Sequence, residues 1–237
     1  MFFRTLLSVF VVCCGLSVGA QGINTDHNVE RSATELAEDL KYILEASRNI
    51  KEVRYEGIRG TPYRYKDFGK AILFDASMRP YPLDSVNYNG FSNHFDFFHE
   101  GVLRELNGNN FLRVEVPQAE GPNHIYARGL NVKFPKSYAR IVFQGDNIIA
   151  TLIYNVINDE KIVENPGQTL KLQRFSAKSL YYALVDGEFV TLKLTAKKLA
   201  EDLGFPSELK KFIKKEKLKP GRDEDLVKIF AAADGMF

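Results

Sequence analysis

Residues 180–194 read LYYALVDGEFVTLKL, and this stretch decides the class of fold. Two short runs, both rich in aromatic and β-branched residues, flank Asp186-Gly187. This dipeptide tolerates the positive φ angles that a two-residue hairpin turn requires at both central positions. The stretch therefore predicts two antiparallel strands that follow each other directly along the chain.

The same pattern of short apolar runs and turn residues continues through the middle of the chain. Asn107-Gly108 and Gly145-Asp146 predict two further hairpins. No helical stretch of 10–15 residues separates the runs, so crossover connections and a parallel sheet are not expected. The candidate strands are residues 51–57, 70–75, 84–89, 94–99, 111–116, 129–134, 138–143, 148–157, 171–175, 180–185 and 188–194.

Residues 32–44 have the pattern of an amphipathic helix. Ser32 and Glu35 have the spacing of a capping box, in which each side chain satisfies an unpaired amide at a helix start. The apolar residues of this segment fall on one helical stripe, namely Leu36, Ala37, Leu40, Ile43 and Leu44. We therefore expect a polar lead-in and one helix over residues 21–50.

The last forty residues return to helical spacing. Thr195 predicts the cap of a first short helix, which Gly204 ends. A second helix begins near Ser207, and Pro220-Gly221 ends it. A third begins at Asp223, where the positive end of the helix dipole favours acidic residues. The apolar stripes of the second and third helices consist of Leu209, Phe212, Ile213, Leu226, Ile229, Phe230 and Ala233.

Residues 1–20 have the three zones of a secretory signal peptide. Arg4 gives a basic start, an apolar run follows, and residues 18–20 are small, as a signal peptidase requires. The apolar run is shorter than the ~20 residues of a transmembrane helix. We expect cleavage before Gln21, no membrane-spanning segment afterwards, and a periplasmic, outer-envelope-associated or secreted protein. An uncleaved anchor and a lipoprotein are the alternatives.

Cleavage at this position would also remove Cys13 and Cys14, the only two cysteines. A mature chain without thiols excludes disulfides, thiol catalysis and thiolate metal sites. Loss of Arg4 leaves 31 basic and 30 acidic side chains. This balance lacks the basic excess of a general nucleic-acid-binding domain, so no nucleic-acid partner is expected. We expect no cofactor.

Together these patterns predict an α+β fold. A strongly curved antiparallel sheet or partial barrel over residues 51–195 forms the β domain. The N-terminal helix flanks it, and a helical tail of two to three short helices over residues 196–237 packs on it. The sequence leaves the oligomeric state open.

Several motifs in the C-terminal third carry a resemblance to a known family. They are residues 181–189 (YYALVDGEF), 192–194 (LKL), 208–215 (ELKKFIKK) and 224–228 (EDLVK). Upstream, GTPY at residues 60–63 together with Phe68-Gly69 is similar to a Gly-Ser-Pro-Tyr segment of the same family. On these motifs the chain resembles a family of uncharacterised exported proteins frequent in Bacteroidota. The resemblance implies a Gram-negative envelope setting and supplies no catalytic residue.

The histidines are the first candidates for site chemistry. His94 and Asp96 alternate onto one side of a predicted strand, which makes them weak candidates for a divalent-metal site. His99 would point to the opposite side of that strand, and the spacing matches no ligand frame, so no metal is expected. The alternative is a polar strand edge among phenylalanines. His27 in the lead-in and His124 in a predicted loop are taken as bystanders.

Two further groups are candidate binding residues. Tyr63, Arg64 and Tyr65 combine aromatic rings with a guanidinium, which suits stacking on sugars or holding a peptide. The structural alternative is that Pro62 fixes a turn and Tyr63 covers the rim of the sheet. The other group consists of lysines on the second tail helix, Lys211, Lys214 and Lys215, which either bind an anionic surface or form a solvated face.

No sequence motif of hydrolytic catalysis is present. The leading hypothesis is a non-catalytic module that binds an envelope protein, a glycan or an anionic surface. An exported hydrolase without a local motif and a purely structural envelope component are the alternatives. A deep cleft with convergent, perturbed titratable groups would favour the enzyme, whereas an exposed sheet edge or aromatic patch would favour the binding module.

Overall fold

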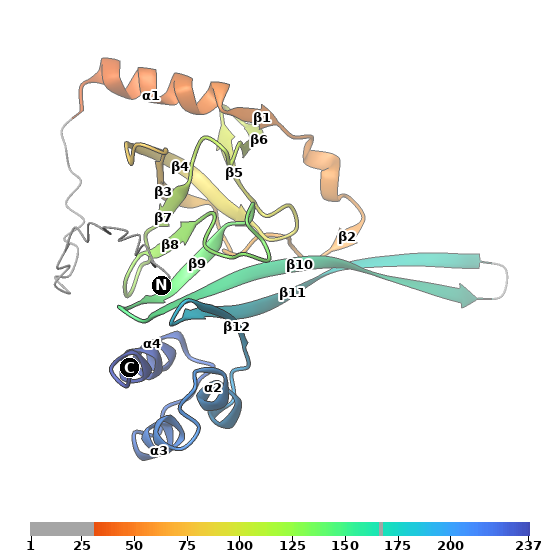
Figure 1. Cartoon of the computed structure of the whole chain (residues 1–237). Coiled ribbons are helices and arrows are strands. Elements are labelled where there is room, and N and C mark those ends of the chain that lie inside the picture. The colour runs from red at the N-terminus through yellow and green to blue at the C-terminus, as the bar shows by residue number, and fades with distance from the viewer. Residues whose placement is uncertain (1–30, 166–167) are drawn as a thin grey trace, which may run out of the picture.

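The computed structural model describes residues 31–165 and 168–237, so the predicted signal peptide and residues 21–30 of the lead-in lie outside the described residues. The chain has a β-rich α+β fold, which confirms the predicted class. An open, curved sheet of 12 strands lies between the N-terminal helix at one end of the molecule and three C-terminal helices at the other end (Figure 1).

The strands follow the order β1-β6-β5-β4-β3-β7-β8-β9-β10-β11-β12, and β2 pairs separately with β11. Most neighbours in this order are also consecutive in the sequence, as expected of hairpin connections. The bounds are β1 (Ser47–Asn49), β2 (Ile58–Arg59), β3 (Gly69–Phe74), β4 (Pro80–Asn89), β5 (His94–His99), β6 (Val102–Leu106), β7 (Arg113–Val116), β8 (His124–Ala127), β9 (Ala139–Gln144), β10 (Ile148–Asn165), β11 (Gln168–Val185) and β12 (Glu188–Leu192).

One pairing departs from the predicted antiparallel pattern. β2 runs parallel to β11, with Ile58 opposite Gln173 and Arg59 opposite Arg174. All other strand pairs in residues 31–165 and 168–237 are antiparallel. Parallel pairing is compatible with this chain because most of the sheet itself connects β2 to β11, and no dedicated crossover helix is needed.

Two of the three predicted hairpin turns are confirmed. Asp186 and Gly187 have φ angles of 45° and 79° between β11 and β12. Gly145 donates its amide to the carbonyl of Ile148 at 2.8 Å and turns β9 into β10. The predicted hairpin at Asn107-Gly108 is not formed, so this prediction is wrong: the flanking strands β6 and β7 pair with other strands and not with each other. Asn107 instead donates its amide to the carbonyl of Ala46, 61 residues upstream.

Two predicted strands are also wrong. The segment over residues 51–57 contains the 3₁₀ helix η1 (Glu52–Tyr55). The segment over residues 129–134 is irregular. The side-chain oxygen of Asn131 accepts the Lys133 amide at 3.0 Å, and the backbone carbonyl of Asn131 accepts the Phe134 amide. Such local side-chain bonds compete with strand pairing. Four short strands, β1, β2, β6 and β8, have no counterpart among the predicted ones.

Helix α1 (Ala33–Glu45) begins at the capping box. The Ser32 hydroxyl accepts the Glu35 amide at 3.2 Å, and the Glu35 carboxylate accepts the Ser32 amide at 2.9 Å. Ile43 is buried in the main core. Asp39 is buried as well, and its carboxylate is paired with Arg31 and Arg79.

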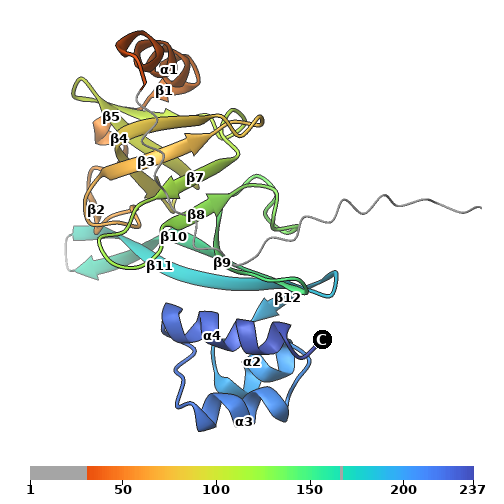
Figure 2. The ribbon, with the colours of Figure 1, turned by 90° about the vertical axis from the view of Figure 1, so that its left-hand side faces the viewer.

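The tail consists of α2 (Ala196–Asp202), α3 (Glu208–Lys215) and α4 (Asp223–Asp234), which lie together beneath the sheet (Figure 2). Thr195 caps α2 by accepting the Lys198 amide at 3.3 Å. The tail shares one apolar cluster with β10, β11 and β12, built from Ile148, Ala150, Ala183, Leu192, Leu199, Ala200, Leu203, Leu209, Ile213, Leu226, Ile229, Phe230 and Ala233. Burial of these side chains provides the main attraction between the tail and the sheet.

The outer halves of β10 and β11 extend away from the body as a two-stranded ribbon (Figure 1). We call residues 161–165 and 168–172, which pair with each other at the tip of this ribbon, the arm. β9 pairs with β10 only at residues 149–152, and β2 and β12 pair with β11 only at residues 173–174 and 181–185. Within the described chain, the two strands of the arm therefore pair only with each other.

Candidate functional site

The segment that contains Tyr63, Arg64 and Tyr65 runs along the edge of β4. The Arg64 amide donates to the Tyr88 carbonyl, and the Gly90 amide donates to the Pro62 carbonyl, both at 2.9 Å. A side chain at Gly90 would meet the Tyr154 ring at 2.6 Å, so the close approach of this turn requires glycine. Successive residues of an extended segment point to opposite sides, so Tyr63 and Tyr65 leave the segment on the same side. Their hydroxyl groups nevertheless belong to two separate polar networks.

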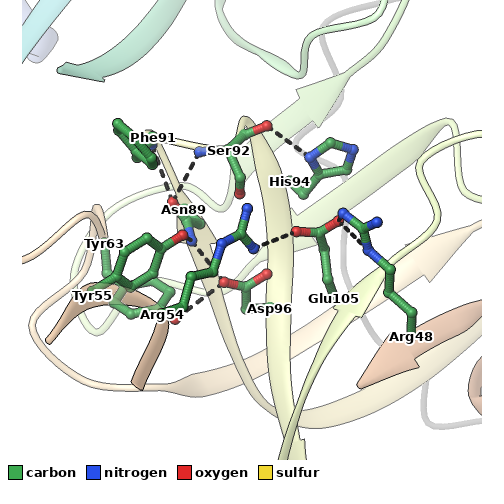
Figure 3. A network of polar contacts seen from close by, with 10 residues as sticks. All are labelled: Arg48, Arg54, Tyr55, Tyr63, Asn89, Phe91, Ser92, His94, Asp96 and Glu105. Carbon is green, nitrogen blue, oxygen red and sulfur yellow. Dashed lines mark hydrogen bonds and ion pairs between the residues drawn. The ribbon is translucent and has the colours of Figure 1, made fainter. Parts of the chain in front are cut away.

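The first network surrounds Asp96 on β5 (Figure 3). Asp96 is fully buried, and one of its carboxylate oxygens accepts hydrogen bonds from Asn89 Nδ2 at 2.8 Å and from the Tyr63 hydroxyl at 3.1 Å. The other carboxylate oxygen has no hydrogen-bond partner within the described chain. Burial raises the pKa of Asp96 to about 6, although both hydrogen bonds oppose the shift.

Glu105 on β6 lies directly opposite Asp96 in the sheet. It accepts hydrogen bonds from Arg54 Nη1 and Arg48 Nε, each at 2.9 Å. Burial acts to raise the pKa of Glu105, but the bonds from the two guanidinium groups outweigh burial and lower the pKa. Two neighbouring carboxyl groups therefore have pKa values shifted in opposite directions.

Such a divided pair is the arrangement that acid and base catalysis uses. Asp96 and Glu105 are, however, 0% and 3% exposed. A hollow of about 360 Å³ lies beside the network and is lined by Glu45, Ser47, Arg48, His94 and Glu105 together with Ala46, Leu106 and Asn107. Asp96 does not line this hollow, so a substrate held there would not contact the acid with the raised pKa.

His94 and Asp96, the weak metal candidates, share this face but make separate contacts. His94 Nδ1 lies 2.7 Å from the Ser92 carbonyl, while the Asp96 carboxylate is held by Asn89 and Tyr63. Among residues 31–165 and 168–237, no three His, Cys, Asp or Glu side chains are placed to hold a metal ion.

The second network contains His124, which lies at the start of β8 rather than in the predicted loop. Arg140 Nη1 donates to His124 Nε2 at 2.9 Å, so the ring must carry its proton on Nδ1, where it donates to the Tyr65 hydroxyl at 2.8 Å. Tyr65 in turn lies 2.8 Å from the Tyr126 hydroxyl. Burial, and then the charges of Arg140 and Arg64, lower the pKa of His124 to about 4, so the ring is neutral at neutral pH.

The same network joins the sheet to the tail. Arg140 Nη2 donates to the Asp223 carboxylate at the start of α4 at 2.6 Å, and the Arg140 side chain is only 4% exposed. A hollow of about 220 Å³ between β8, β9 and α4 is lined in part by His124, Arg140, Asp223 and Val227. The geometry fits a hydrogen-bonded connection that holds α4 on the sheet.

Sequence reasoning did not find Arg140 and Asp223. They lie 83 residues apart, and Arg140 lies 16 residues from His124, so no local spacing links the three. Tyr65 was predicted as a binding residue only because it follows Tyr63 and Arg64 in the sequence. A signal for this network exists only in the folded chain, because it depends on how α4 returns to the sheet.

The structure separates the two groups of predicted binding residues. Tyr63 and Tyr65 use their hydroxyls in the two internal networks, and the Arg64 guanidinium lies 5.0 Å from the centre of the Tyr154 ring. Lys211, Lys214 and Lys215 are exposed on α3, and none of them belongs to either network. The two groups therefore do not form one site.

Comparisons with protein-family models, with curated proteins and with solved structures find no match to this chain. None of the helices described is long and apolar enough to cross a bilayer. The function of the chain must therefore be argued from its own geometry.

Proposed function

We propose that the chain is an exported, non-catalytic interaction module that binds a protein of the cell envelope through its arm. The observation that carries this proposal is a row of apolar side chains on an unsupported ribbon. Val163 and Leu170 are directly paired, and Leu172 lies two residues from Leu170 on the same face. Leu170 and Leu172 are 37% and 41% exposed.

The physical argument concerns the stability of the arm. A two-stranded ribbon in water is at best marginally stable, because neither face is covered and each strand has one open edge. Ile162, which is 60% exposed, lies on the opposite face, so both sides of the ribbon carry apolar surface. A partner that covers this surface would remove it from water and would order the arm.

The hydrolase alternative receives less support. Its best acid, Asp96, is buried under the segment from Arg54 to Tyr63 and does not line the hollow beside Glu105. An exposed sheet edge and apolar surface on the arm meet the criterion for a binding module. The envelope setting rests on the signal-peptide pattern and on the family resemblance, and both remain predictions.

The test uses a triple variant, Val163→Thr, Leu170→Thr and Leu172→Thr. Threonine keeps the strand preference of the arm and removes apolar surface. A photo-crosslinking residue at position 161, opposite Leu172, should give one discrete adduct with an envelope protein in the native cell. We expect the triple variant to lose at least about 90% of this adduct, because a hot-spot cluster contributes most of the binding energy.

The matched control changes three exposed apolar residues outside the arm, Val53→Thr, Val132→Thr and Val227→Thr. The control should leave the adduct unchanged. Both triple variants should unfold within a few degrees of the parent, since none of the six side chains belongs to a buried core. An adduct that persists in the arm variant, or that is lost equally in the control, would reject the arm as the binding surface.

A further inference from the structure

The exposed side of α3 carries a compact group of cations. At 100° per residue, Lys211 lies directly opposite the buried side of the helix formed by Leu209 and Ile213, and Lys214 and Lys215 lie on either side of it. We call these three lysines the α3 lysine surface. Lys215 approaches only Glu216, at 4.0 Å, and neither Lys211 nor Lys214 forms an ion pair within residues 31–165 and 168–237.

Positive charge is concentrated around this surface although the chain as a whole is nearly neutral. Residues 210–222 contain seven basic side chains and one acidic side chain, Glu216. The three acids at the start of α4 do not neutralise this group in full, because Asp223 is paired with Arg140 of the sheet. The α3 lysine surface is thus a local cationic region, which can act on a partner even though the net charge is small.

The surface lies at one end of the molecule. In both views the tail forms the end opposite α1, and α3 is its outermost helix (Figure 2). No other described element extends past α3 in this direction, so a flat surface could approach the lysines without meeting the sheet or the arm. None of the three lysines lines the hollows described above.

We infer that the α3 lysine surface binds the anionic headgroups of a phospholipid bilayer and holds the protein peripherally on the membrane. Lysine ammonium groups are point charges that need no bidentate geometry, which suits a diffuse layer of lipid phosphates. A polyanionic chain such as an acidic polysaccharide would be expected to lie in a basic groove, and this helix is convex. The inference does not depend on the partner of the arm.

The test is co-sedimentation of the chain, as purified from its own cells, with vesicles of phosphatidylcholine or of phosphatidylcholine mixed with phosphatidylglycerol. The parent should bind only the anionic vesicles, and added salt should release it. The triple variant Lys211→Gln, Lys214→Gln and Lys215→Gln should bind roughly 100-fold more weakly, since each lysine near an anionic surface contributes roughly a fivefold factor.

Two controls separate the role of this surface from that of net charge. The first control removes the same charge from three exposed lysines of the body in one triple variant, Lys51→Gln, Lys66→Gln and Lys70→Gln. This variant should bind like the parent. Lys211→Arg, Lys214→Arg and Lys215→Arg should also keep binding, because charge rather than shape is required.

Several results would overturn the inference. These are equal binding to neutral vesicles, equal losses in the two glutamine variants, or unchanged binding after the α3 substitutions. Retention on an acidic polysaccharide resin without binding to either vesicle would assign the surface to a glycan instead. Circular dichroism of the variants checks that α3 remains folded. Crosslinking at the arm is a separate readout, so the failure of one proposal leaves the other intact.

Discussion

Replacing Asp234 with alanine is expected to lower the free energy of unfolding by about 3 kcal/mol. Asp234 is the last residue of α4, and its carboxylate accepts the amides of Asp146, Asn147 and Ile148 at 3.1, 2.8 and 2.8 Å. Each hydrogen bond to a charged group contributes about 1.5–3 kcal/mol when buried and less at the surface. Urea denaturation measures the change as a lower midpoint with an unchanged slope.

Two further variants test the cause of that loss. Asp234→Asn retains one side-chain oxygen that can accept from Asn147 and Ile148, so it should lose about half as much stability as the alanine variant. A Cβ at Gly145 would meet the Asp234 carboxylate, so Gly145→Ala should destabilise the parent and cost less in the Asp234→Ala background. Additive effects of the two alanine substitutions, or an alanine variant at position 234 as stable as the parent, would show that this contact is unimportant.

Replacing Asp96 with asparagine is expected to stabilise the protein at neutral pH. The pKa of Asp96 is raised from 3.8 to about 6 in the folded chain, so the unfolded chain releases this proton more readily. The contribution of Asp96 to stability is therefore full below pH 4 and is lost as the pH rises to about 6. A shift of this size corresponds to about 3 kcal/mol in full, of which roughly 2 kcal/mol falls between pH 4 and pH 7.

Urea unfolding of the parent and of Asp96→Asn at pH 4 and pH 7 tests this expectation. Asparagine keeps a side-chain oxygen for the bonds from Asn89 and Tyr63 but cannot ionise. Its advantage over aspartate should therefore grow by roughly 2 kcal/mol from pH 4 to pH 7. Tyr63→Phe, which removes a donor to the charged form, should instead weaken the parent more at pH 7 than at pH 4. Parallel pH profiles for all three proteins would contradict the raised pKa.

These two carboxylates also illustrate how the molecule is held together. Asp234 fastens one end of α4 to the β9–β10 turn, and Asp223 fastens the other end to Arg140. The apolar cluster beneath the sheet attracts the tail, and the two polar contacts determine its position on the sheet. Asp96 contributes differently, because it connects β5 to the segment that covers it while retaining a costly buried charge at neutral pH.

The arm shows why sequence patterns underestimated two strands. The prediction ended β10 at residue 157 and divided β11 into residues 171–175 and 180–185, because the polar residues between these runs are typical of loops. Both strands have 18 residues in the structure. A ribbon that is exposed on both faces accepts polar side chains at every position, so the alternation that marks a half-buried strand is absent. The unsupported arm could not be recognised for the same reason.

Sequence alone determined the features that depend on neighbouring residues. The hairpin at Asp186-Gly187 follows from backbone conformations that few residues adopt, and the helix start at Ser32 follows from hydrogen bonds within a single turn. Tertiary structure alone decided the acidity of Asp96, the bonded state of His124 and the pairing of Arg140 with Asp223. A pKa depends on burial and on charges brought close by folding, and these contacts join segments that are distant in the sequence.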